Sequence, residues 1–99
     1  MQPLSGAQRK YLRGLAHHLK PVVHVGRNGV TEPVLQEIAE ALDYHELIKV
    51  KLADPQGRKK ELAEEIAGRS GGAWVGLVGK VVTLYRQHPD PEKRQIEMP

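Results

Sequence analysis

The segment Pro21-Val22-Val23-His24-Val25-Gly26-Arg27-Asn28-Gly29-Val30-Thr31 predicts a strand, a four-residue turn and the start of a helix. The apolar run 22–25, bounded by Pro and Gly, is typical of an interior strand in a partly parallel sheet. Thr31 is a suitable N-cap for a helix that we expect to reach Asp43. The segment therefore predicts the first half of a parallel β-α-β unit.

The turn 26–29 has the chemistry of a phosphate-binding loop. Gly26 and Gly29 let a ligand approach the backbone closely, and the first amides of the following helix are unpaired donors with partial positive charge. Arg27 adds a forked donor that suits phosphate. A G-x-x-G spacing is common in a chain with ten glycines, and a strand-to-helix turn uses glycine anyway. Both a structural and a phosphate-binding interpretation remain open at this point.

The preceding segment predicts a helix from Ser5 to about Lys20. Ser5 and Gln8 form a capping box, and Pro21 ends the helix. Apolar residues at helical spacing predict its buried stripe, which consists of Leu12, Leu15, Ala16 and Leu19.

The rest of the chain predicts a strand, a helix and a hairpin. In the strand 45–52, Lys49 and Lys51 share one sheet face by alternation. A helix follows from about Gln56 to Arg69, and the strands 73–78 and 80–86 are joined at Gly79. The tail 87–99 has three prolines and no periodicity, so we expect it to be flexible or draped over a domain formed by residues 1–86.

The topology gathers cations at one end of the sheet. Ligands of parallel sheets bind beyond the carboxyl ends of the strands. The turn 26–29, Lys51 and Lys80 all belong to that end, and Arg9 and Lys10 would join them if the first helix packed antiparallel to the first strand. Arg86 falls outside this cluster. Either it has a structural role, or the phosphate-binding surface extends beyond the cluster.

Composition limits the class of protein. A chain of 99 residues forms one domain, and the absence of Phe makes its core aliphatic. The absence of Cys excludes disulfides and thiolate chemistry, and no stretch approaches the roughly 20 apolar residues of a membrane span. We expect a cytoplasmic protein. The net charge is only +3, so binding of a polyanion must follow from where the charges lie.

Enzymatic motifs are missing from the sequence. Gly76-Leu77-Val78-Gly79 precedes Lys80, but Val81 stands where a P-loop requires Ser or Thr. No H-E-x-x-H motif or Cys/His ligand spacing is present. The histidines are dispersed along the chain, at His17, His18, His24, His45 and His88. We therefore expect no catalysis, no metal and no cofactor.

Four motifs in order resemble the CRM domain (chloroplast RNA splicing and ribosome maturation), whose bacterial stand-alone form is the YhbY-like family. They are Leu15-Ala16 with Leu19-Lys20-Pro21-Val22-Val23, then Gly26-Arg27-Asn28-Gly29-Val30-Thr31, then His45-Glu46-Leu47-Ile48-Lys49-Val50-Lys51, and Gly79-Lys80-Val81-Val82-Thr83-Leu84-Tyr85-Arg86. The likeness covers roughly residues 4–86.

This resemblance implies a fold and a function. The fold is α/β (α+β), a two-layer α-β-α-β-α-β-β arrangement similar to the C-terminal domain of translation initiation factor three. Its four-stranded mixed sheet holds the fourth strand between the second and the third. The implied function is RNA binding in precursors of the large ribosomal subunit, by a G-x-x-G loop that maps onto residues 26–29 and by basic positions that map onto Lys49, Lys80 and Arg86.

We accordingly expect an RNA-binding protein, a monomer, that acts on ribosomal RNA during ribosome assembly and meets ribosomal proteins there. With few aromatic residues, it would recognise RNA backbone and shape. The predicted RNA-contacting residues are Arg9, Lys10, Arg13, Gly26, Arg27, Asn28, Gly29, Thr31, Lys49, Lys51, Lys80 and Arg86. The alternative is a protein-interaction adaptor that docks through the acidic face of the helix 31–43.

Overall fold

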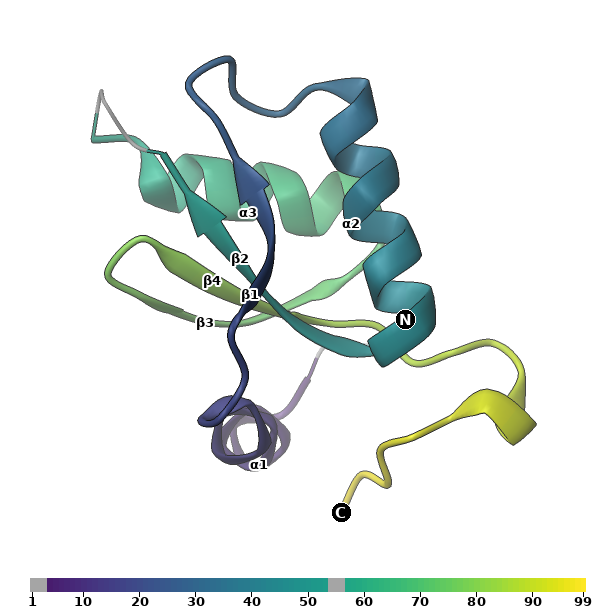
Figure 1. Cartoon of the computed structure of the whole chain (residues 1–99). Coiled ribbons are helices and arrows are strands. Elements are labelled where there is room, and N and C mark those ends of the chain that lie inside the picture. The colour runs from purple at the N-terminus through teal and green to yellow at the C-terminus, as the bar shows by residue number, and fades with distance from the viewer. Residues whose placement is uncertain (1–3, 54–56) are drawn as a thin grey trace.

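The structure is a computed structural model that describes residues 4–53 and 57–99 of the chain (Figure 1). Within these residues, no helix is long and apolar enough to cross a membrane. The elements are α1 (Gly6–Ala16), β1 (Pro21–Val25), α2 (Glu32–His45), β2 (Leu47–Leu52), α3 (Lys59–Ser70), β3 (Ala73–Val78), β4 (Val81–Tyr85) and the 3-10 helix η1 (Pro91–Lys93). The predicted order of elements is confirmed, although the expected start of the third helix at Gln56 lies outside the described residues.

The sheet is mixed, with the strand order β1-β2-β4-β3. β1 and β2 pair in parallel, whereas β4 pairs antiparallel with both β2 and β3. The insertion of β4 between β2 and β3 is thus confirmed. The Leu52 amide donates to the Lys80 carbonyl at 2.7 Å, which ties the end of β2 to the β3–β4 turn. This turn, the end of β2 and the β1–α2 loop lie at the same end of the sheet (Figure 1).

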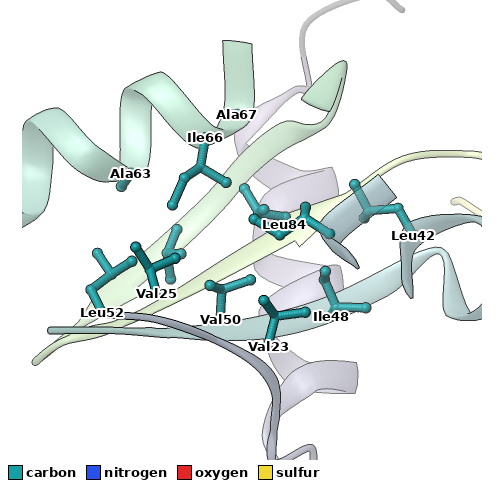
Figure 2. Close-up of a cluster of buried hydrophobic side chains, with 12 residues drawn as sticks. Val23, Val25, Leu42, Ile48, Val50, Leu52, Ala63, Ile66, Ala67 and Leu84 are labelled. Carbon is teal, nitrogen blue, oxygen red and sulfur yellow. The ribbon is translucent and has the colours of Figure 1, made fainter. Parts of the chain in front are cut away.

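The main core lies between one face of the sheet and the helices α2 and α3. Figure 2 shows side chains of the strands pointing toward those of the helices. Ile38 and Leu42 of α2 and Ile66 of α3 are fully buried there. The strand residues of this core alternate along the chain, as the period of two predicts. They are Val23, Val25, Ile48, Val50, Leu52, Val82 and Leu84.

The helix α1 lies on the other face of the sheet and adds part of a third layer. It packs against β2, β3 and β4, where Leu12 and Ala16 join Leu47, Val75 and Tyr85 in a second buried cluster. Figure 1 looks down the axis of α1 while the strands run across the view, so α1 crosses the strands. The helix α1 therefore does not pack antiparallel to β1. That packing was the condition for Arg9 and Lys10 to reach the glycine turn.

The end of α1 comes four residues before the predicted one. Its capping box is confirmed by two hydrogen bonds of 3.0 Å between Ser5 and Gln8. After Ala16 the Leu19 amide donates to the Ala16 carbonyl, which is a turn and not a helical bond. A helix running through Pro21 would press the proline ring against the His17 carbonyl, so the chain leaves the helix early. The prediction that Leu15 and Leu19 are buried was wrong: Leu19 lies beyond the end of the helix, and Leu15, although within α1, is also exposed.

The strand β1 is an edge strand, and the prediction of an interior strand was wrong. Val23 and Val25 are buried under the helices, but Val22 remains 49% exposed on the opposite face and His24 is exposed beside it. The apolar run suggested burial on both faces. Because α1 packs over the other three strands, one face of β1 stays uncovered.

The segment 87–99 is draped over the domain and attached to it by Glu46. This residue ends α2 with a φ of 63° and is fully buried. Its carboxylate accepts hydrogen bonds from the backbone amides of His88 (2.8 Å), Gln95 and Ile96 (3.1 Å). Ile96 and Met98 pack against the second buried cluster. The tail therefore continues the layer that α1 begins.

Candidate nucleic-acid interface

Positive and negative charges are unevenly distributed among the elements of the molecule. Residues 4–31 and the strands β2, β3 and β4 contain no Asp or Glu, whereas α2 carries acidic residues and no Lys or Arg. These α1-side elements are therefore cationic without acids of their own, and the acids on that side, Asp90, Glu92 and Glu97, belong to the tail. We call the surface formed by α1, by the α1 side of the sheet and by the adjoining loops the basic face. Its cations are Arg9, Lys10, Arg13, Lys20, Arg27, Lys49, Lys51 and Lys80.

The two predicted lysines of β2 lie together on the basic face. Lys51 is the register partner of His24 in β1 and of Val81 in β4, while Lys49 is opposite Thr83. The neighbouring residues of β2 point into the main core, so alternation turns both lysines away from it. Lys51 is exposed and Lys49 is half-buried. A polyanion crossing the uncovered strands would meet both ammonium groups.

The backbone conformation requires glycine at only one of the two glycine positions of the turn. Gly29 has a φ of 76°, and its amide donates to the Gly26 carbonyl at 3.0 Å. Gly26 has no positive φ, and a Cβ added there would meet no atom within 4 Å. Arg27 and Asn28 are exposed between them. Folding thus requires glycine only at Gly29, because most residues adopt the backbone of Gly26 without strain.

The start of α2 offers fewer free amides than the sequence suggested. Thr31 is confirmed as the N-cap, and its hydroxyl accepts from the Val34 amide at 3.4 Å. Pro33 has no amide hydrogen. Glu32 places a carboxylate at this end, where it pairs with Arg69 at 2.8 Å. The positive end of the helix dipole is therefore partly neutralised, and phosphate binding rests more on the turn and on Arg27.

Arg86 holds the fold together instead of joining the basic face. Its guanidinium donates to the Ser70 carbonyl (2.6 Å), to the Ala39 carbonyl (2.9 Å) and to the Asp43 carboxylate (2.7 Å). These bonds link the end of α3 to α2. Of the two interpretations in the sequence, the structure supports the structural one, and Arg86 is not included in the interface.

The cations of α1 lie beside β3, at the edge of the sheet opposite β1. Arg9 and Arg13 line a shallow depression together with Lys60 and the backbone of β3. The Arg13 guanidinium reaches the Val75 carbonyl at 3.5 Å. The basic face consequently has two parts, one beside α1 and β3 and another at the glycine turn, and the lysines of β2 lie between them.

Two further polar residues on this surface were not among the predicted RNA-contacting residues. His17 and Thr83 line the space beside Lys49, between α1 and the sheet. The pairing of Lys49 with Thr83 follows from the register of β2 and β4. Alternation in the predicted hairpin was the available signal for Thr83, but the position of His17 depends on the early end of α1.

Comparison with known families agrees with this architecture. Residues 4–86 match the CRS1 / YhbY (CRM) domain. The chain belongs to this family. A Haemophilus influenzae protein named "RNA-binding protein" is 45% identical over 100 residues, covering 100% of this chain and 98% of its own. The Bacillus subtilis protein "Probable RNA-binding protein YqeI" is 39% identical over 97 residues, covering 97% of this chain and 99% of its own.

A solved structure has the same fold. The solution structure of a hypothetical protein from Staphylococcus aureus superposes with a TM-score of 0.80 and 32% sequence identity. The match covers 95% of this chain and 99% of that one. The three helices and the mixed sheet of this CRM domain therefore recur in an experimentally determined structure.

Proposed function

We propose that this CRM domain protein binds ribosomal RNA in precursors of the large ribosomal subunit, as a monomer in the cytoplasm. The observation that supports RNA binding most directly is the separation of charge. Lys49 and Lys51 lie on a sheet face whose strands β2, β3 and β4 carry no acidic residues, which suits a phosphate backbone. Relatives that match nearly the whole chain are named RNA-binding proteins. The choice of ribosomal RNA rests on the family resemblance.

The arrangement supports recognition of backbone and shape. Phosphates would contact the lysines of β2 and Arg27, while the exposed turn 26–29 would let the RNA backbone approach closely. Trp74 is half-buried against the main core and also lines the depression beside Arg9 and Arg13, so base stacking by this residue would be local to that depression. Binding through these groups is sequence-tolerant, and specificity comes from the shape of the folded RNA.

Crosslinking in cells tests the identity of the RNA. We expect ultraviolet crosslinking, followed by sequencing of the attached RNA, to enrich large-subunit ribosomal RNA, and the protein to sediment with large-subunit precursors. Enrichment of unrelated RNAs would contradict the ribosomal assignment. Association that persists after nuclease treatment in high salt would instead favour the adaptor alternative, with the acidic face of α2 as the contact surface.

The glycine turn provides a test that separates binding from folding. The change Gly26→Val adds bulk where folding does not need glycine, so we expect RNA affinity to fall about tenfold while the unfolding free energy changes by less than about 0.5 kcal/mol. Gly29→Ala, by contrast, forces a side chain into the left-handed region and should cost about 1 kcal/mol of stability. Fluorescence anisotropy and urea denaturation measure the two effects. Unchanged affinity in Gly26→Val would show that the turn is structural only.

A further inference from the structure

A groove on the basic face has an apolar surface and a cationic rim. It lies between the C-terminal end of α1 and the β3–β4 hairpin and has a volume of about 500 Å³. Leu19, Pro21, Val78 and Val81 provide its apolar lining. Leu19 is 39% and Val78 is 79% exposed, so the core does not account for these side chains. Its volume lies within the range of pockets that hold small organic groups.

The polar lining of the groove is suited to an anion. Arg13, His17 and Lys49 line it, and it contains no Asp or Glu. The Thr83 side chain adds a hydroxyl beside Lys49. An occupant must therefore combine an apolar ring or chain with a negative charge. A nucleotide has this combination, because its base presents flat apolar faces and its phosphate is anionic.

The position of Arg13 is fixed by a glycine in β3. A Cβ added at Gly76 would lie 3.2 Å from the Arg13 Cδ, so the lack of a side chain there gives Arg13 room against the strand. The guanidinium is directed toward the Val75 carbonyl at 3.5 Å. An arginine held along a sheet can stack on a base with its planar group and keeps donors for phosphate.

We propose that this groove holds one unpaired nucleotide of the bound RNA, with its base against Leu19, Val78 and Val81 and its phosphate beside Lys49. The proposal rests on the proposed RNA-binding function and adds a substrate class to it. A double helix keeps its bases stacked and presents only backbone and groove edges, so its bases cannot enter a recess of this kind. Single-stranded loops and bulges supply bases that can be turned out and buried.

The test compares a single-stranded oligonucleotide with a duplex of the same length. The variant Leu19→Ser/Val78→Ser removes apolar lining at exposed positions and leaves the charge unchanged. We expect it to bind the single strand about fivefold more weakly, with duplex affinity and the salt dependence of binding unchanged. The matched control Leu15→Ser/Tyr44→Ser removes exposed apolar groups outside the groove and should bind like the wild type.

A second measurement locates the base directly. A single strand containing 4-thiouridine should crosslink on irradiation to peptides of α1 and the β3–β4 hairpin. Equal weakening for single strand and duplex, no weakening, or crosslinks confined to the turn 26–29 would each overturn the groove proposal and leave RNA binding standing. Failure of the wild-type protein to bind either RNA would overturn both proposals. Urea denaturation of each variant shows that the compared proteins are folded.

Discussion

Replacing Lys49 and Lys51 by glutamate should lower RNA affinity about 100-fold at 100 mM salt, because two attractive phosphate contacts become repulsive. Both side chains point to the α1 side of the sheet, between the two other cationic parts of the basic face. If the wild type neutralises about four phosphates, log affinity should fall with log salt at a slope near −3. With two of the four contacts left, the double variant should show a slope near −1.5.

The control for this experiment is the double change Lys59→Glu/Lys93→Glu. It alters the net charge equally, but Lys59 belongs to α3 and Lys93 to η1, so the change leaves the cations of β2 in place. We expect less than a threefold loss of affinity in the control. Equal losses in the two double variants would mean that net charge, and not the surface of β2, governs binding. Fluorescence anisotropy across a salt series measures both affinity and slope.

Replacing Glu46 by alanine should lower the free energy of unfolding by about 3 kcal/mol, because the backbone amides of the tail lose a charged acceptor in a buried site. The variant should also release the segment 87–99 from the domain. Hydrogen exchange at the Gln95 and Ile96 amides, which donate to this carboxylate, would then become fast. Urea denaturation gives the stability change.

An exposed acid of the same tail provides the control for Glu46. Glu97 is exposed, so Glu97→Ala should change stability by less than about 0.5 kcal/mol. A small effect of Glu46→Ala, with slow exchange at Gln95 and Ile96, would show that apolar packing of Ile96 and Met98 alone holds the tail.

The burial of Tyr85 raises its pKa, and the nearby Glu46 charge raises it further. Loss of that charge should therefore move the Tyr85 pKa partway back toward its ordinary value.

The local elements could be predicted because their signals are short-range. The capping box of α1, the N-cap at Thr31 and the alternation of β2 each depend on residues a few positions apart. The insertion of β4 between β2 and β3 came from the resemblance to the CRM domain. For the candidate site, alternation placed Lys49 and Lys51 on one face without knowledge of the tertiary structure.

The remaining features depend on contacts that sequence patterns do not encode. Glu46 receives hydrogen bonds from residues about 50 positions away, in a segment without periodicity. Arg86 carries the same charge as Lys80, and only the nearby carbonyls of Ser70 and Ala39 distinguish its role. The crossing direction of α1 follows from packing on three strands, so the separation of Arg9 from the glycine turn could not be read from spacing.

The separation of charge between the layers also affects how the protein reaches its partner. A molecule with cations on one side and the acids of α2 on the other has an electric dipole, and the field of a polyanion turns it before any contact forms. Productive encounters then become more frequent than random collision allows, most of all at low ionic strength. Once the protein is bound to RNA, the acidic surface of α2 faces the solvent. We expect that surface to repel a second nucleic-acid strand, which disfavours bridging of two strands by one copy.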